Sequence, residues 1–287
     1  MQLNRIYHED CLVGLKQITT ESIDLVVSDV PYKICAGGVS IERRKDEMGG
    51  VLQKRKDLHG NAYEKAGSKH ISLCGVLNDK QTIVRSNCKI GEKWVRADGV
   101  VPSAVRNGKM FEHNDIKFSE WLPDVYRVLK NGTHCYLMIN SRNLKDLQVE
   151  AEKVGFKLQN LLVWRKHNAT PNKYYMQQLE FILMLRKGAA RNVNDMGISN
   201  CLSCPNIIGK GRDEHPTAKP IALMEVLIKQ SSNVADVVLD PFAGGGSTLI
   251  AAKRLERQYI GFEIDKQYYD MANRRLTKEP QQMDMFN

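Results

Sequence analysis

One segment constrains the fold of this chain more than any other: a short apolar strand that runs through three glycines into a helix. The strand covers residues 237–239 and ends in Asp240, and the glycines, 244–246, come directly before a helix that starts near Ser247. Glycine lets the backbone turn tightly and lets a ligand approach where a side chain would collide. The acid that ends the strand is placed to hold a cationic group of such a ligand. The segment therefore predicts a nucleotide-type pocket in an α/β fold.

Apolar strands and amphipathic helices alternate along most of the chain. Apolar patterning predicts strands over residues 3–7, 23–28, 133–139, 161–165, 179–185, 237–239 and 259–263. It predicts helices over residues 11–18, 118–129, 143–154, 220–231, 247–255 and 266–276. Asn131-Gly132 is expected to end the second of these helices, and residues 187–212 have a loop-like pattern. Such alternation indicates a largely parallel sheet with helices on both faces.

The positive charge of the chain is concentrated in one segment. The 287 residues carry 42 Lys and Arg against 33 Asp and Glu, a net charge of +9. Residues 33–110 hold 16 of the basic and 8 of the acidic residues, a net charge of +8. This segment is rich in glycine and shows little apolar periodicity. We interpret it as a basic module set into a globular frame, and a basic excess favours a polyanionic partner such as nucleic acid.

The cysteines and the apolar runs indicate the compartment. The seven cysteines are scattered and odd in number, and no signal peptide precedes them. No apolar run approaches the roughly 20 residues of a membrane helix. We therefore expect a soluble cytoplasmic protein that does not enter a membrane. Cys201 and Cys204 could begin a zinc site, but the other two ligands would have to come from Cys74, Cys88 or a histidine far away, so no metal is expected.

Three further motifs accompany the glycine loop in a fixed order. The tetrad Asp29-Val30-Pro31-Tyr32 follows the second strand, His-Pro-Thr-Ala-Lys-Pro covers residues 215–220, and Ile-Gly-Phe-Glu covers residues 260–263. In this order the motifs resemble those of the β-class amino-methyltransferases of DNA, which methylate an exocyclic base nitrogen with S-adenosylmethionine. The resemblance covers residues 1–32 and 118–276. It implies a Rossmann-like methyltransferase fold with a circularly permuted motif order, in which the base-binding strand precedes the cofactor-binding strands.

The resemblance implies a catalytic role for the tetrad. Asp29 and the carbonyl of residue 30 would accept the two hydrogens of an amine whose lone pair is otherwise delocalised into the base. Pro31 would hold the turn rigid, and Tyr32 would stack on a base flipped out of the duplex. The family has proline where this chain has Val30, so the loop loses one constraint on φ. A leading aspartate favours adenine N6, because the cytosine-N4 subgroup usually has serine there.

The same resemblance implies the cofactor pocket. Asp240 and the loop after it would line the methionine half of S-adenosylmethionine, Glu263 would accept the ribose hydroxyls, and Asp10 would lie near the adenine amine. The full set of expected cofactor residues is Asp10, Thr217, Lys219, Pro220, Asp240, Phe242, Gly244, Gly246 and Glu263. Lys219 is suited to a carboxylate. A nicotinamide dinucleotide site is the alternative, but Leu249 stands where its third glycine should be.

The basic segment suggests where DNA is recognised. We expect a catalytic domain over residues 1–32 and 118–287, and an insertion over residues 33–117 that supplies most of the target recognition, with residues 187–212 contributing. The alternative is a flexible charged surface loop. Lysines would confer salt-dependent affinity, and a few arginines would recognise guanines.

Together these features predict a site-specific DNA methyltransferase that transfers a methyl group from S-adenosylmethionine to N6 of a flipped-out adenine. Cytosine-N4 methylation, RNA methylation and a non-catalytic DNA-binding protein remain alternatives. Double-stranded DNA is the expected partner, and a homodimer is a further expectation from the family. Gln282 to Phe286 resembles the peptide with which bacterial replication proteins dock on the sliding clamp, although a frayed polar tail is the alternative.

Overall fold

The computed structural model describes residues 1–32, 87–90, 93–96, 116–170, 175–206 and 218–279. The chain divides into two compact units, one of Met1–Tyr32 with His113–Asn287 and one of Lys33–Glu112. In the second unit, strands β3 (Asn87–Ile90) and β4 (Lys93–Arg96) form an antiparallel pair. Most of the basic insertion lies outside the described residues, so its predicted role is not tested by the fold.

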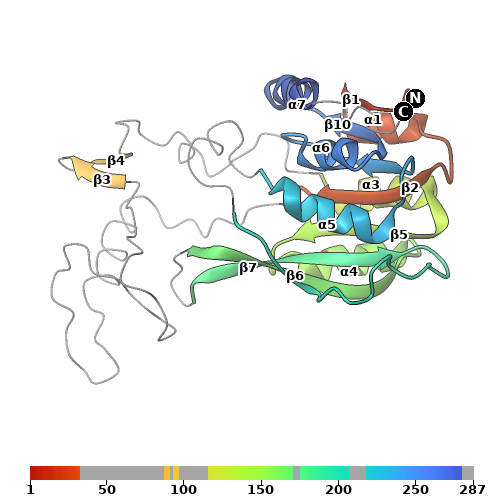
Figure 1. Ribbon diagram of the computed structural model, residues 1–287, viewed down its shortest axis with the longest axis horizontal. Coiled ribbons are helices and arrows are strands. Elements are labelled where there is room, and N and C mark those ends of the chain that lie inside the picture. Colours follow the sequence, from red (N-terminus) through yellow and green to blue (C-terminus); the bar gives the residue numbers. More distant parts are fainter. Residues whose placement is uncertain (33–86, 91–92, 97–115, 171–174, 207–217, 280–287) are drawn as a thin grey trace, which may run out of the picture. The chain divides into compact units, whose positions relative to one another are not determined.

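Among the described residues, eight strands of the first unit form one sheet (Figure 1). They are β1 (Arg5–His8), β2 (Ile23–Asp29), β5 (Leu129–Ile139), β6 (Lys157–Thr170), β7 (Gln177–Arg186), β8 (Cys201–Ser203), β9 (Val237–Asp240) and β10 (Gln258–Glu263). Their order across the sheet is β1-β10-β9-β2-β5-β7-β6-β8. Strand β7 runs antiparallel to both of its neighbours, and every other pair is parallel. The predicted, mostly parallel α/β sheet is confirmed.

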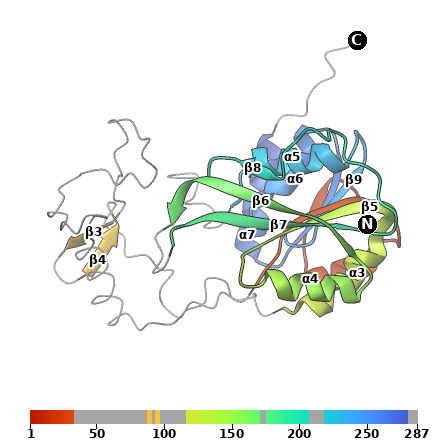
Figure 2. The ribbon, with the colours of Figure 1, turned by 90° about the horizontal axis from the view of Figure 1, so that it is seen from below.

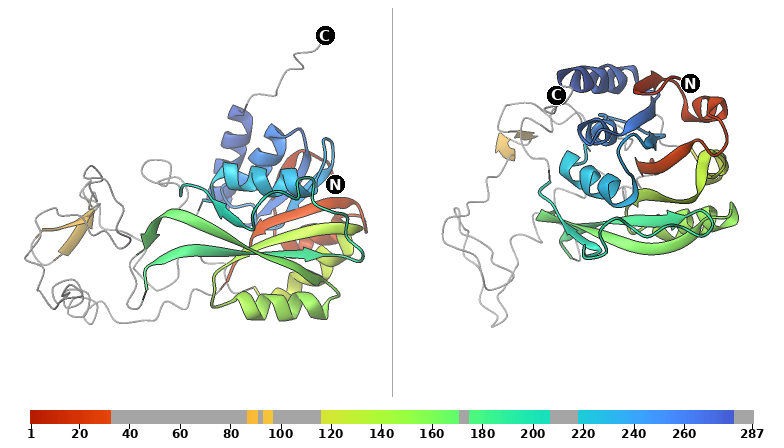
Figure 3. Two further views of the ribbon diagram at one scale, coloured as in Figure 1. Left: turned by 60° about the horizontal axis from the view of Figure 1, so that its bottom comes forward. Right: turned by 45° about the vertical axis from the view of Figure 1, so that its right-hand side comes forward.

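Helices cover both faces of this sheet, as predicted. The helices are α1 (Cys11–Gln17), α3 (Phe118–Val128), α4 (Leu144–Lys153), α5 (Ile221–Ser231), α6 (Ser247–Arg254) and α7 (Lys266–Lys278). Helices α1, α3 and α4 pack on one face, and α5, α6 and α7 pack on the other (Figures 2 and 3). None of the helices in the described ranges has the length and apolarity needed to cross a bilayer.

The core explains why these segments take these forms. Helix α3 buries Trp121, Leu122, Val125 and Val128, a stripe at helical spacing that faces the sheet. Strand β2 is different, because six of its seven residues are buried without alternation. A continuous apolar run is typical of a parallel strand covered on both faces. The strand that carries the tetrad is thus central and rigidly held.

The permuted motif order is visible in the strand neighbours. Leu25 and Val26 of β2 lie beside Val238 and Leu239 of β9, more than 200 residues later in the chain. Strand β1 pairs with β10 at one edge of the sheet. After β2 the next strand of the sheet, β5, lies on one side of the β2–β9 border, and after β9 the next strand, β10, lies on the other side. Such a border is a topological switch point, where α/β folds bind ligands.

Two predictions about local structure were wrong. Asn131-Gly132 does not end α3, because the helix ends at Val128 and the chain enters β5 directly at Leu129, whose backbone is extended. Leu129 pairs with Ile23 of β2, so sheet formation outweighs the turn tendency of the Asn-Gly pair. The segment predicted as a loop after β7 contains β8, which extends the sheet by pairing with β6.

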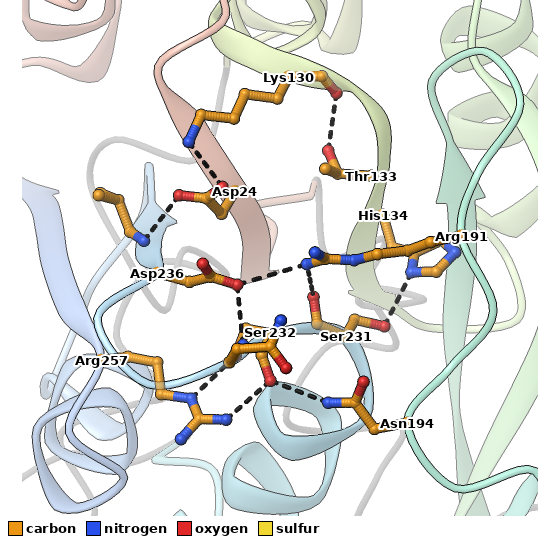
Figure 4. Close-up of polar contacts among 12 residues, drawn as sticks. Asp24, Lys130, Thr133, His134, Arg191, Asn194, Ser231, Ser232, Asp236 and Arg257 are labelled. Carbon is orange, nitrogen blue, oxygen red and sulfur yellow. Dashed lines mark hydrogen bonds and ion pairs between the residues drawn. The ribbon is translucent and has the colours of Figure 1, made fainter.

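A polar cluster fixes the carboxyl end of α5 (Figure 4). Arg191 donates to the carbonyl of Ser231 at 2.9 Å, and Arg257 and Asn194 donate to the carbonyl of Ser232 at 2.7 and 3.0 Å. The last carbonyls of a helix lack partners within the helix, so such donors complete it. The cluster borders the amino end of β9, at the opposite edge of the sheet from the glycine loop.

Candidate active site

Acidic side chains gather at one edge of the sheet. Asp29 ends β2, Asp240 ends β9, Glu263 ends β10, and Asp10 follows β1 by two residues. Because these strands are parallel, their carboxyl ends meet at the same edge. The sequence predicted each of these acids as a site residue, and the fold brings them to one side of the sheet.

A hydrogen bond that the sequence did not predict joins the two strands at the switch point. Ser28 is fully buried, and its Oγ donates to Oδ1 of Asp240 at 2.6 Å. The backbone N–H of Phe242 donates to the same oxygen at 3.1 Å. Burial raises the pKa of Asp240 to about 6, although hydrogen bonds from Ser28 and Thr248 oppose the rise. Asp240 is thus a buried anchor for the loop that follows it.

The glycine loop is held in a conformation that side chains rarely adopt. Gly244 has φ of 50° and Gly246, the N-cap of α6, has φ of 78°. A Cβ on Gly246 would lie 3.0 Å from the Cβ of Ala272. Phe242 leaves the loop toward α3, where its ring packs edge-on against Trp121 with the centroids 5.1 Å apart. The loop is therefore braced on both faces of the sheet.

Glu263 ties the loop to β10. Its Oε2 accepts the N–H of Gly244 and its Oε1 accepts the N–H of Asp265, both at 2.8 Å. Burial raises the pKa of this carboxyl in spite of those two bonds. A carboxylate oxygen can accept a second hydrogen bond, so Glu263 keeps acceptor capacity for a ligand. Asp10 is the N-cap of α1 and accepts the N–H of Leu12 at 2.9 Å.

Two unsatisfied polar atoms mark the same region. In the part of the chain that the structure describes, the buried side-chain nitrogen and oxygen atoms without a hydrogen-bond partner are Nε1 of Trp121 and Oγ of Ser247. Trp121 touches Phe242 of the loop, and Ser247 is the first residue of α6. Buried polar groups normally have partners. Together with the acceptor capacity of Glu263 and the glycines that let a ligand approach the backbone, these donors fit a small polar ligand such as S-adenosylmethionine.

The tetrad lies beside this pocket, at the end of β2. The N–H of Val30 donates to the carbonyl of Met138 on β5 at 3.3 Å, and its side chain is buried. Proline has no N–H, so this bond is available only because the chain departs from the family at this position. Pro31 and Tyr32 are half-buried, and Tyr32 forms a side-chain hydrogen bond with Asn140.

Lys219, which was expected at the edge of the cofactor pocket and suited to a carboxylate, pairs with the carboxylate of Asp29. Its Nζ is 2.5 Å from Oδ2 of Asp29 and 3.6 Å from Oε2 of Glu180. Burial lowers the pKa of Lys219, but the two carboxylates outweigh burial and raise it overall. Pro220 is buried as the N-cap of α5. Thr217, with His215 and Pro216, lies outside the described residues.

Sequence analysis missed three polar residues of this site: Ser28, Glu180 and Lys166. Lys166 of β6 forms an ion pair with Oε1 of Glu180 of β7. A glutamate inside the apolar strand Gln177–Arg186 was a signal that could have been used, because a charge is placed in such a strand only with a partner.

The cysteine pair does not assemble a metal centre among the described residues. Cys201 is exposed, Cys204 is half-buried, and neither forms a disulfide. No group of three or more potential metal ligands is found in the ranges that the structure describes. Cys74 lies outside those ranges.

The fold and the site together define a Rossmann-like methyltransferase. Solved structures with the same fold include the M1.HpyAVI–SAM complex (21% identity, TM-score 0.58, 95% of this chain and 98% of that one). They also include the cytosine-N4-specific PvuII DNA methyltransferase (15% identity, TM-score 0.59, 97% and 87%). These two likenesses show the fold.

Sequence comparison identifies the family. The N6/N4 methyltransferase model, described as DNA methylase, matches residues 23–274. This chain belongs to that family, and it is a DNA methyltransferase that depends on S-adenosylmethionine. Similar proteins include the type II methyltransferases M2.DpnII of Streptococcus pneumoniae (25% identity, 96% of this chain, 90% of that one) and M.HinfI of Haemophilus influenzae (25%, 96% and 69%).

Proposed function

We propose that this enzyme transfers a methyl group from S-adenosylmethionine to N6 of an adenine flipped out of double-stranded DNA. The observation that carries the proposal is the position of Asp29 at the end of β2, directly after the serine that anchors the cofactor loop. About a third of the Asp29 side chain, 30%, is exposed, so a substrate amine can reach it.

The tetrad would make the target amine a nucleophile. Lys219 engages Oδ2 of Asp29, which leaves Oδ1 to accept one N–H of the amine. The carbonyl of Val30 would accept the other, and the bond from the Val30 N–H to Met138 fixes this peptide in place of the missing proline. Two acceptors that draw the hydrogens to one side favour a pyramidal nitrogen with an exposed lone pair. Holding the amine in that orientation is the main contribution of these residues.

Tyr32 would hold the flipped base. Stacking on an aromatic ring contributes about 1–3 kcal/mol per base and offsets the cost of unstacking. The side-chain hydrogen bond with Asn140 would orient the phenol ring. The base would then lie between Tyr32 and the free oxygen of Asp29.

The pocket beside the tetrad would hold the methyl donor. When bound, S-adenosylmethionine supplies an electrophilic methyl group on a sulfonium centre. Glu263 would accept the ribose hydroxyls with the lone pairs that its two backbone bonds leave free. Gly244 and Gly246 would let the methionine half approach the backbone, and Asp10 would lie near the adenine amine. Thr217, Pro220, Asp240 and Phe242 would complete the pocket.

Product analysis tests this proposal. The purified enzyme is incubated with labelled S-adenosylmethionine and unmethylated genomic DNA, and the digested nucleosides are separated. We expect N6-methyladenine, and we expect its loss in Asp29→Ala but not in Asp270→Ala, which alters an exposed acid on α7. N4-methylcytosine as the product, methylation of RNA alone, or full activity of Asp29→Ala would overturn the assignment.

The basic insertion, residues 33–117, is proposed to grip and recognise DNA. The support is its 17 Lys and Arg against 10 Asp and Glu, a net charge of +7 out of +9 for the chain. Replacing Arg43, Arg44 and Lys45 by alanine should weaken DNA binding and flatten its dependence on salt, because each lost phosphate contact reduces the slope of log K against log salt by about 0.9. An unchanged slope would refute this role.

Two finer partner proposals have their own tests. A homodimer would be detected by sedimentation of the full chain. Docking on the sliding clamp through Gln282 to Phe286, which lie outside the described residues, would be lost when the last six residues are removed, and equal capture of both forms by the clamp would refute it.

A further inference from the structure

Four charged side chains of alternating sign run through the site from four separate segments. Lys166 of β6 pairs with Glu180 of β7, Glu180 faces Lys219 ahead of α5, and Lys219 pairs with Asp29 of β2. Lys166 and Glu180 have no role in the chemistry proposed above, and Lys219 acts there only by engaging Oδ2 of Asp29. Only Asp29 would touch the substrate.

We call these four side chains, Lys166, Glu180, Lys219 and Asp29, the charged row. The end of the row away from Asp29, at Lys166, is firmly held. Glu180 lies opposite Trp164 in the β6–β7 register, and Lys166 is two residues further along β6 on the same face. The ammonium of Lys166 lies over the Trp164 ring, 5.4 Å from its centroid. Trp164 is itself buried and donates through Nε1 to the carbonyl of Cys204 at 2.9 Å. Lys166 is thus fixed by a buried ring and by its carboxylate partner.

Glu180 uses its two oxygens for two different lysines. Its Oε1 meets Lys166, and its Oε2 lies 3.6 Å from Nζ of Lys219. Burial alone raises the pKa of Glu180, but the two lysines outweigh burial and keep the pKa below its usual value. Glu180 therefore stays ionised between the two lysines. It can hold Lys219 in place while Lys166 compensates its negative charge.

We propose that Glu180 and Lys166 are positioning residues for methyl transfer: Lys166 holds Glu180, Glu180 holds Lys219, and Lys219 orients Asp29 so that one carboxylate oxygen stays free for the target amine. This proposal rests on the proposed function of Asp29. Because Glu180 attracts the ammonium of Lys219, it weakens the ion pair between Lys219 and Asp29. Lys166 attracts Glu180 in turn, and so weakens the ion pair between Glu180 and Lys219. The row therefore sets both the orientation and the ionisation of Asp29.

The pH dependence of the reaction can reveal such a row. The charged and titratable groups that face Asp29 are Lys219, Glu180, Lys166, Tyr32 and Asp240. Burial raises the pKa of Asp29, and the nearby carboxylate of Glu180 raises it further. The ammonium groups of Lys219 and Lys166 lower the pKa of Asp29. Activity needs the carboxylate, so the rate should fall as the pH drops through the pKa of Asp29.

The test measures single-turnover methyl transfer to unmethylated genomic DNA against pH for four variants. Lys219→Met should move the acidic limb upward by about one pH unit, because a close cation is lost. Lys166→Met should also move it upward, but by less, and Lys166→Arg should restore the wild-type profile. Glu180→Gln should move it downward. Each variant except Lys166→Arg should lower the maximal rate, by about tenfold or more for Lys219→Met.

Opposite shifts in Glu180→Gln and Lys166→Met are the outcome that a merely structural role would not produce. The matched control is Glu150→Gln, which breaks an exposed Lys–Glu pair on α4 and should leave the profile unchanged. Shifts of the same sign, or no shift in either variant, would overturn the inference while leaving the role of Asp29 intact. Full activity of Asp29→Ala would instead overturn the proposed function.

Discussion

The stability of the protein against pH tests the burial of Asp240, because ionising a buried carboxyl lowers the free energy of unfolding. The side chain is 2% exposed, and its pKa rises from 3.8 to about 6 in the folded protein. An acid whose pKa is raised by folding binds its proton more tightly in the native state. The free energy of unfolding therefore falls as the pH rises from about 4 to above 6. The shift of about two units corresponds to about 3 kcal/mol.

Asp240→Asn should remove that cost. The amide oxygen can still accept from Ser28 and from the N–H of Phe242, so the loop keeps its anchor. We expect the variant to gain up to about 3 kcal/mol of stability over the wild type above pH 7, and less than about 1 kcal/mol near pH 4, where the folded-state acid is protonated and the unfolded-state acid is about half ionised. It should also bind S-adenosylmethionine more weakly, because the carboxylate charge is gone.

The assay is urea unfolding at pH 4, 6 and 8, followed by the fluorescence of Trp121 and Trp164, which are buried in the same unit. Asp270→Asn, which removes an exposed acid that pairs with Lys266, is the control and should change stability by no more than about 0.5 kcal/mol at each pH. A variant that is less stable than the wild type at pH 8, or a stability difference that does not grow with pH, would refute the reasoning.

Three further substitutions probe the rest of the site. Gly246→Ala should destabilise the fold by about 1–2 kcal/mol, since φ is 78° and the new Cβ meets Ala272, and should weaken cofactor binding in calorimetric titration; intact affinity would count against the loop's role. Ser28→Ala should cost about 1.5–3 kcal/mol at pH 8 in urea unfolding, because it removes a hydrogen bond to a buried charge, and an unchanged midpoint would contradict this. Tyr32→Ala should weaken binding of DNA by about 1–3 kcal/mol while Tyr32→Phe keeps the stacking; equal losses in fluorescence-anisotropy titrations would argue against a stacked base.

The sequence predicted the frame of the site well, because that frame is local. Strand ends are visible as apolar runs that stop at an acid, as at Asp240, and the resemblance to the methyltransferase family pointed to Asp29 and Glu263 at the ends of two further strands. It failed at Asn131-Gly132, where a turn signal was overridden by the pairing of Leu129 with Ile23 across more than 100 residues.

The missed residues share one cause, which is dependence on partners far away in the chain. Glu180 and Lys166 were missed because their partners come from other strands, and the pairing of Lys219 with Asp29, 190 residues earlier, was likewise not foreseen. Ser28 was given no role, although its hydroxyl donates to Asp240, an acid 212 residues later. Such contacts between residues far apart in the chain depend on the order of the strands in the sheet. The sequence gives no direct measure of side-chain contact across a sheet.

The border between β2 and β9 has a consequence for how the protein is made. The strand that carries the tetrad leaves the ribosome early, but its neighbour, β9, is synthesised only after another two hundred residues. Until then β2 lacks one edge, and β1 waits still longer for β10. Contacts of such long sequence separation form slowly. The proposed methyl-donor pocket is therefore incomplete until translation has passed Glu263, and chaperones have most reason to cover β2 during that interval.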